Sequence, residues 1–232
     1  MNNQLLQVKF RERLNKLDSQ DYGNIECWQI AEAFNKAMDA WVSRQLEGIN
    51  QTRSTAEGSI RSIDKLQVIL TEGAITMVDH GDYWEGPLPA DYSEWSRLSA
   101  NAVANCCPPR RLKIFLGENA DLDIDLLDKL KRPSFEWAET LAIVSGSEIR
   151  IYTNDCFDIA TPVLSYYRRA KHIQIAGCVN PDDNTPVTVD VECEFPNNVT
   201  ETIIDEGAAI LADDMDNYNK MQTLNTNAEH SN

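Results

Sequence analysis

The chain has 232 residues, of which 37 are acidic and 21 basic, and its formal charge is −16. With 42% apolar residues, a chain of this length can build one or two domains with a buried core, which excludes collagen-like, coiled-coil and disordered chains. A pI near 4.5 argues against a protein that grips nucleic acid phosphates, because such proteins need clustered Lys and Arg. Residues 1–65 hold nine acidic and nine basic side chains, so the unbalanced charge lies in residues 66–232.

The start of the chain predicts where the protein is made. Met1–Lys9 lacks the apolar run of a signal peptide, and no later segment approaches the ~20 apolar residues of a membrane helix. We therefore expect synthesis in the cytoplasm and no membrane contact. In that reducing compartment the cysteines, none at C-x-x-C spacing, are expected to be small buried hydrophobes. They are Cys27, Cys106, Cys107, Cys156, Cys178 and Cys193.

Two amphipathic helices are predicted within residues 1–65. Apolar residues recur at spacings of four, four and three between Leu5 and Leu17, which places them on one face of a helix. A broader apolar stripe lies between a suitable N-cap, Asn24, and a stop signal, Gly48, with charged residues on the opposite face. The second segment is the strongest helical pattern in the chain.

Residues 66–196 read as a β-rich region, because the apolar period shortens to 2 and turn residues recur. Ser145–Ser147 is typical of a hairpin turn, and Asn180–Asn184 is a polar loop. Short strands and short loops favour a small sandwich or a barrel-like sheet. The predicted strands are Leu66–Leu70, Ile75–Asp79, Leu112–Leu116, Leu141–Val144, Glu148–Tyr152, His172–Ala176 and the alternating run Val187–Cys193.

A final helix is predicted from Asn197 to Tyr218, where apolar residues alternate at spacings of four and three, as in helix-on-helix packing. Gly207 marks either a close approach by another backbone or, as we expect, a tolerated accident. Residues 219–232 are polar and expected to be disordered. The layout predicts an α+β fold: residues 1–65 and 197–218 form one helical body, and region 66–196 is inserted between them.

The common nucleotide-binding and hydrolase motifs are missing from the sequence. Asp79, His80 and Asp82 suggest an alternative function, an acidic divalent-metal-dependent hydrolase, although a turn between strands explains them better. Asp121-x-Asp123-x-Asp125 resembles the opening of an EF-hand loop, but the required Gly and bidentate Glu are absent, so a short helix over 125–131 is favoured. We therefore expect no catalytic residues, no metal and no cofactor.

Two aromatic clusters are typical of recognition, because Tyr, Trp and Arg anchor many protein interfaces. One is the run Tyr166–Arg169, and the other is the proline-stiffened loop Asp82–Tyr92. Each cluster also fits a role in capping the core of one subunit. The candidate interface residues are Trp84, Tyr92, Tyr166, Tyr167, Arg168 and Arg169.

Several stretches together resemble the ring-forming neck and tail structural proteins of crAss-like phages, which infect Bacteroidetes. They are Asn24–Ala37, Pro133–Thr140, Ile149–Asp155, Tyr166–Arg169, Glu192–Phe195 and Ile203–Glu206, and the similarity runs from about residue 20 to about residue 218. The resemblance implies a virion protein like the head-to-tail adaptors beneath a portal. It also implies a closed, dodecameric ring built from heterologous contacts between identical subunits.

The resemblance further implies partners and a place for the acidic charge. The partners are the portal protein, other neck or tail proteins, and double-stranded DNA that passes through the ring without specific binding. An acidic lumen repels DNA phosphates and prevents sticking. We therefore expect the acidic β-rich region and final helix to supply the lumen wall.

Overall fold

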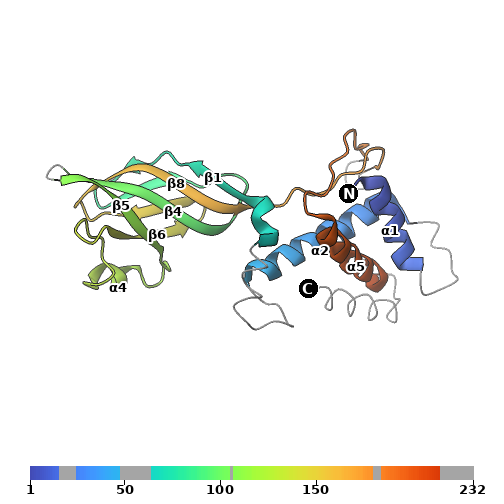
Figure 1. Cartoon of the computed structure of the whole chain (residues 1–232), viewed down its shortest axis with the longest axis horizontal. Coiled ribbons are helices and arrows are strands. Elements are labelled where there is room, and N and C mark those ends of the chain that lie inside the picture. The colour runs from blue at the N-terminus through green and yellow to red at the C-terminus, as the bar shows by residue number, and fades with distance from the viewer. Residues whose placement is uncertain (16–24, 48–63, 105–106, 180–183, 215–232) are drawn as a thin grey trace. The chain divides into compact units, whose positions relative to one another are not determined.

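The computed structural model describes residues 1–15, 25–47, 64–104, 107–179 and 184–214 (Figure 1). The chain forms two compact units. The first, the helical unit, comprises Met1–Val68 and Ala170–Asn232, and the second, the β-unit, is Ile69–Arg169. The predicted α+β class is therefore confirmed, but the inserted unit ends at Arg169 and not at residue 196.

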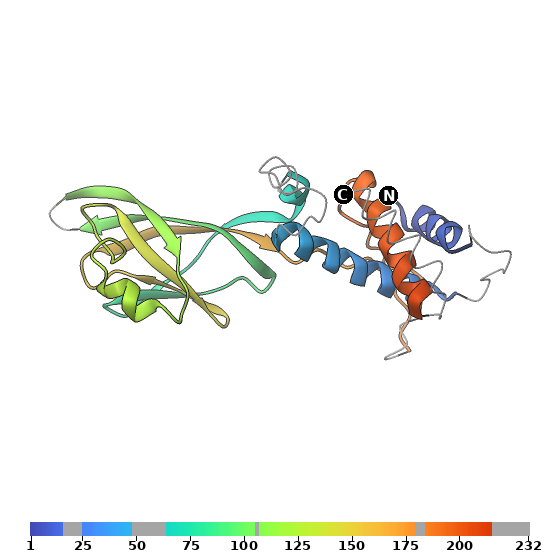
Figure 2. The ribbon, with the colours of Figure 1, turned by 90° about the horizontal axis from the view of Figure 1, so that it is seen from below.

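Three α-helices build the described part of the helical unit: α1 (Asn3–Asn15), α2 (Cys27–Glu47) and α5 (Asn197–Asp214). The apolar stripe of α2 is its buried face, where Ile30, Phe34, Met38 and Trp41 are fully shielded from solvent. Helix α5 contacts both other helices and lies between them (Figures 1 and 2). The predicted ends of the first and last helices, residues 16–17 and 215–218, fall outside the described residues.

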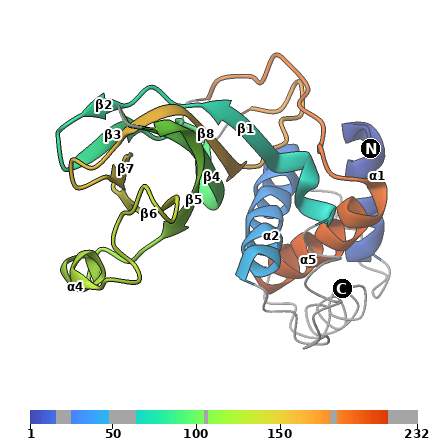
Figure 3. The same ribbon diagram turned by 60° about the vertical axis from the view of Figure 1, so that its left-hand side comes forward.

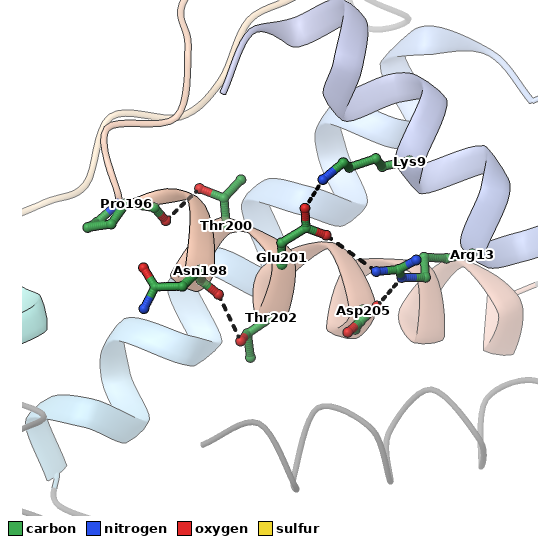
Figure 4. Close-up of polar contacts among 8 residues, drawn as sticks. All are labelled: Lys9, Arg13, Pro196, Asn198, Thr200, Glu201, Thr202 and Asp205. Carbon is green, nitrogen blue, oxygen red and sulfur yellow. Dashed lines mark hydrogen bonds and ion pairs between the residues drawn. The ribbon is translucent and has the colours of Figure 1, made fainter.

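Helix α5 is held to the other helices by charge as well as by apolar packing. The Nε of Arg13 donates to Asp205 Oδ1 over 2.6 Å, and its Nη2 lies 3.3 Å from Glu201 Oε2 (Figure 4). Three carboxylates of α5 form ion pairs with basic side chains of α1 and α2, so these three carboxylates do not add to an unbalanced acidic surface. The ion pairs are Lys9–Glu201, Arg13–Glu201, Arg13–Asp205 and Arg44–Glu206.

Gly207 lies where α5 crosses the other two helices. A Cβ atom on Gly207 would lie 3.0 Å from Phe10 Cε2, 3.2 Å from Ala33 O and 3.3 Å from Phe34 Cα. The expectation of a tolerated accident was therefore wrong, because this glycine is what allows the backbones to approach.

Residues 170–196 belong to the helical unit, and the two strands predicted there are not formed. In the described part of the segment, isolated bridges pair Gln174 with Val191 and Val179 with Pro186, and no continuous strand forms. The apolar alternation of Val187–Cys193 is not one buried face, because Cys193 is buried whereas Val189 is 63% exposed. The residues after it do pack on a helix: Phe195 meets the Trp41 ring edge-on at 5.4 Å between ring centroids. The alternation of apolar and polar residues therefore indicated an extended segment, but this segment does not form a regular strand pair.

Cys27 and Cys178 form a disulfide that joins the first residue of α2 to the 170–196 segment, with 5.8 Å between their Cα atoms. Of the described cysteines outside this disulfide, Cys107 and Cys156 are exposed and Cys193 is buried. The expectation that all six cysteines are small buried hydrophobes was therefore wrong. The disulfide partners stand 151 residues apart, so local spacing could not reveal the pair.

The β-unit is a single eight-stranded sheet that curls on itself (Figure 3), and not two packed sheets. The strand order is β1-β8-β4-β5-β6-β7-β3-β2, and every neighbouring pair is antiparallel except β5–β6. The strands are β1 (Leu70–Ala74), β2 (Val78–Asp79), β3 (Tyr83–Pro87), β4 (Tyr92–Ala104), β5 (Cys107–Leu116), β6 (Glu139–Ser145), β7 (Glu148–Tyr152) and β8 (Asp158–Arg168).

The predicted strands agree with this sheet only in part. Glu148–Tyr152 is β7, and two other predictions lie within β5 and β6. Leu66–Ile69 is a 3-10 turn, η1, because Leu66 and Ile69 are buried three residues apart. Strands β3, β4 and β8 were not predicted. The expectation of a loop over Asp82–Tyr92 was wrong for Tyr83–Pro87, which is β3. Register shifts between β4 and β8 at three places along β4 break its period of two.

A close crossing near β3 gives the first testable prediction. The chain between β1 and β2 passes over Gly86, where a Cβ would lie 2.8 Å from Thr76 O and 2.9 Å from Ile75 Cγ2. We expect Gly86→Ala to lower the free energy of unfolding by about 1–3 kcal/mol, since backbone must move to admit the methyl group. Gly73→Ala is the control, because nothing lies within 4 Å of that Cβ. Equal urea midpoints for the two variants would contradict the crossing.

Candidate interaction surfaces

The chain between the parallel strands β5 and β6 exposes the most apolar surface in the described part of the chain. This crossover carries the short helix α4 (Leu122–Leu127), which lies outside the sheet (Figure 3). Four side chains of this crossover are the most exposed large hydrophobics among the described residues. We call them the crossover surface: Ile124, 68% exposed; Leu127, 83%; Leu130, 88%; and Trp137, 77%.

The crossover surface rests on a fixed platform. Leu122 and Leu126, on the inner side of α4, pack on a small buried cluster of β6 and β7. Asp125 is also buried, and its Oδ1 accepts a hydrogen bond from Lys131 Nζ over 2.6 Å. That bond raises the pKa of Lys131 above its ordinary value. The predicted short helix exists, then, but it starts before Asp125 and turns this carboxylate inward.

Large apolar side chains that stay exposed within one short segment are typical of a contact site. Burying one leucine side chain is worth about 1.5–3 kcal/mol, so covering several of these residues can drive association. Lys129, Lys131 and Arg132 surround Leu130 and are all exposed. The residues before Leu130 include Asp121, Asp123 and Asp128, so the apolar side chains are bordered by both signs of charge.

The helical unit carries a pocket of about 650 Å³ between α2 and the facing segment, of which residues 172–175, 178, 179 and 187 line it. Its apolar lining includes Trp28, Ala31, Ile175, Val179 and Val187. Glu32, Lys36 and Asp39 of α2 and His172 of the facing segment supply its polar groups. A pocket of this volume is large enough to bury several side chains of a ligand or partner.

Paired polar contacts hold the facing segment on α2. The Asn35 side chain accepts from the backbone nitrogen of Ile173 over 2.8 Å and donates to the Ile173 carbonyl over 3.2 Å. Asp39 Oδ2 lies 2.9 Å from His172 Nε2. With the Cys27–Cys178 disulfide, these contacts fix the pocket wall in place.

Asp190 fixes the same segment and gives a pH-dependent prediction. Hydrogen bonds from the Ala176 backbone nitrogen and the Asn3 side chain to Asp190 Oδ1, 2.9 and 3.0 Å long, lower the pKa of its carboxyl. A lowered folded-state pKa contributes stability that is present above the unfolded value of about 3.9 and is lost as the pH falls through the folded value. We therefore expect Asp190→Ala to lower the melting temperature at pH 6 and to lower it by less at pH 2.

The control for this prediction is Glu192→Ala, which removes an exposed carboxylate from the same segment. It should melt like the wild type at both pH values. A melting difference between wild type and Asp190→Ala that is unchanged from pH 6 to pH 2 would contradict the role assigned to the ionised carboxylate.

The structure brings part of the first aromatic cluster into the core of the β-unit. Tyr166 and Tyr167 are 5% and 9% exposed. The Tyr166 hydroxyl donates to Asp91 Oδ1 over 2.8 Å, and its ring centroid lies 5.8 Å from that of Tyr92. Burial first, and then this hydrogen bond, raise the pKa of Tyr166. Tyr166 therefore belongs to the core of the β-unit, as the alternative of core capping expects, and Tyr167 is buried as well.

The remaining predicted interface residues lie in different surroundings. Trp84, on β3, is half-buried and packs against the core of the β-unit. Arg168 is half-buried, and its guanidinium donates to the carbonyl of Arg169, which is exposed. Contact of Trp84, Arg168 and Arg169 with another chain stays a prediction.

The residues of the alternative metal site form a turn. Asp79 Oδ1 accepts from the backbone nitrogen of Gly81, whose φ is +84°, and the His80 ring stacks on Tyr83 with 5.1 Å between centroids. Across the described ranges no group of three or more His, Cys, Asp and Glu side chains is placed to hold a metal ion. The geometry therefore gives the hydrolase alternative no support.

Sequence reasoning missed the crossover surface. One signal was available: the apolar residues between Leu122 and Leu130 lie on more than one side of a short helix. A helix that packs on a sheet with one side leaves the apolar residues of its other sides exposed. Which side faces outward depends on where β6 and β7 lie, and that is a property of the folded unit.

Comparison with known proteins does not place the chain in a family. No protein-family model matches it, and no curated protein matches it either. None of the helices in the described ranges combines the length and the hydropathy needed to span a bilayer. The candidate surfaces must therefore be interpreted from their own chemistry.

Proposed function

We propose that the protein is a non-enzymatic structural subunit of a phage virion, forming a ring in the portal-proximal neck or tail as a head-to-tail connector. The observation that carries the proposal is the crossover surface, whose four apolar side chains are 68–88% exposed on a fixed platform. A ring requires every subunit to offer such a surface to its neighbours. The resemblance to ring-forming neck and tail proteins of crAss-like phages supports this assignment.

The proposal includes the finer architecture of the subunit. The N- and C-terminal helices form the helical body, and the curled sheet is its insertion, as suits an adaptor that contacts several neighbours. The ring is dodecameric if it matches the portal, and double-stranded DNA passes through it.

The charges of the structure narrow the search for the lumen wall. Three of the five carboxylates of α5, those of Glu201, Asp205 and Glu206, pair with Lys9, Arg13 and Arg44, so this helix holds less uncompensated charge than its sequence suggests. Residues 69–169 hold 16 acidic and 10 basic side chains, and residues 170–196 hold five acidic and one basic. We propose that these two regions face the DNA, because uncompensated carboxylates repel its phosphates.

Assembly of the purified full chain tests the role of the crossover surface. We expect the wild type to associate as its concentration rises and Leu127→Glu/Leu130→Glu to stay monomeric with an unchanged melting temperature, since both side chains are exposed in the subunit. Light scattering coupled to size-exclusion chromatography measures the mass. Val78→Glu is the control, because Val78 is an equally apolar residue, 60% exposed, outside the crossover.

Two outcomes would overturn the proposal. Association of the double variant at wild-type concentrations would remove the crossover surface from the assembly. Absence of the chain from purified phage particles, measured by peptide mass spectrometry, would remove the virion role itself.

A further inference from the structure

We propose that the Cys27–Cys178 disulfide is a thiol-sensitive clasp: its reduction releases one wall of the pocket from α2. We call that wall the strap; it comprises residues 176–179 and the bridged residues Pro186 and Val187. Cys27 is the first residue of α2, and Cys178 lines the pocket. The clasp acts within one copy of the chain, so it does not depend on ring formation.

The part of the facing segment before the strap is tied to the helices by side chains. Asn35 of α2 pairs with the backbone nitrogen and the carbonyl of Ile173. Asn3 of α1 donates to the Gln174 carbonyl over 2.7 Å. These contacts do not involve the disulfide, so we expect residues 172–175 to keep their place when it is reduced.

The strap makes its backbone hydrogen bonds within the facing segment. Gly177 N donates to Val187 O over 2.9 Å, and Val187 N donates to Cys178 O over 2.8 Å. A short pair of chain segments with so few bridges is marginally stable at best in water unless it packs on another element. The disulfide is the covalent tie that keeps this pair on α2, and its loss therefore allows local release.

The exposure of the two sulfurs sets the order of the exchange reaction. Cys27 is half-buried and Cys178 is 4% exposed, so a small thiolate attacks Cys27 Sγ. As the new S–S bond forms, the bond to Cys178 breaks, and Cys178 takes the electron pair and then a proton from water.

A second small thiolate completes the reduction. It attacks the reagent sulfur of the mixed disulfide, so a small disulfide leaves and Cys27 Sγ takes the electron pair. The N-terminus of α2 stabilises the Cys27 thiolate. The chain has then gained two electrons, and two small thiols have been oxidised.

Release of the strap changes the pocket. With the disulfide closed, the pocket has a volume of about 650 Å³, and Cys178, Val179 and Val187 form part of its lining. When these residues leave, the apolar side chains of Trp28 and Ala31 on α2 lose that cover. The pocket thus responds to the thiol content of its surroundings.

Alkylation of the native full chain tests the clasp. The protein is reduced with dithiothreitol below its melting temperature, desalted without air and treated with N-ethylmaleimide, and peptide mass spectrometry follows each cysteine. Because Cys178 is buried, it reacts quickly only if the strap leaves α2. We expect its rate to come within about tenfold of that of exposed Cys156. Cys193 is the internal control, because it is equally buried in the same segment and should stay protected.

Two further measurements separate release from side effects of the reductant. Cys27→Ser without reductant should show the same fast alkylation of Cys178, since the clasp is absent. Brief treatment of the oxidised wild type with glutathione, stopped with acid, should place the mixed disulfide on Cys27. A mixed disulfide on Cys178 would show that the strap opens before the bond breaks, which would overturn the clasp.

The relative rates of the two buried cysteines decide the outcome. If Cys178 stays as unreactive as Cys193 after reduction, other contacts hold the strap on α2 and the proposal is wrong. If Cys193 becomes as reactive as Cys178, reduction opens the whole helical unit, and the bond is a structural cross-link and not a switch. Fast reaction of Cys178 beside slow reaction of Cys193 supports local release.

Discussion

Reduction of the Cys27–Cys178 disulfide is expected to lower the free energy of unfolding of the helical unit by about 2–5 kcal/mol. The bond joins residues that are 151 positions apart, so it removes many conformations from the unfolded chain. The loop that it closes contains the whole β-unit, Ile69–Arg169. The effect should therefore be largest when both units unfold together, since a folded β-unit already shortens the flexible part of the loop.

Urea unfolding followed by circular dichroism at 222 nm measures this effect. Cys27→Ser/Cys178→Ser without reductant should match the wild type with dithiothreitol, and both should unfold at lower urea than the oxidised wild type. Cys156→Ser is the control, because Cys156 is an exposed free thiol and its loss should leave the midpoint unchanged. An equal response of the wild type and the double variant to dithiothreitol would show that the disulfide is not the stabilising element.

The Cys27–Cys178 disulfide illustrates the difference between features that local sequence patterns predict and features that depend on distant contacts. Helices α2 and α5 were predicted because their apolar residues recur every three or four positions along the sequence. The disulfide and the position of residues 170–196 depend on contacts between distant parts of the chain. Alternating residues such as those of Val187–Cys193 therefore suggested a strand where the structure has an extended segment packed on helices.

The β-unit shows the same limit. Strand β7 has a regular period and was predicted with its observed bounds, whereas bulges in β4 shift its inward residues out of phase. The aromatic run Tyr166–Arg169 drew attention as a possible interface, yet its two tyrosines are buried. Composition identifies residues that suit an interface, but only the fold determines which of them remain exposed.

Replacing Gly207 with leucine is expected to lower the free energy of unfolding of the helical unit by about 3 kcal/mol, the upper part of the usual range for overpacking a core. The side chain would enter the crossing of α5 with α1 and α2. Two of the three nearest atoms, Ala33 O and Phe34 Cα, belong to the backbone of α2. They can retreat only if the helices separate, which would loosen the buried packing around Phe34.

A series of substitutions separates this steric cost from helix propensity. Gly207→Ala gains about 1 kcal/mol of propensity, which the contacts of its Cβ at 3.0–3.3 Å offset, so we expect almost no net change. Asp213→Leu is the control for leucine on an exposed position of the same helix, and it should unfold like the wild type. If Gly207→Leu unfolded at the same urea concentration as Asp213→Leu, the helices would be able to separate at this crossing without cost. If the urea midpoint of Gly207→Leu lies well below those of Asp213→Leu and Gly207→Ala, the backbones are in close contact at position 207. Neither the leucine side chain itself nor the loss of glycine would then account for the destabilisation.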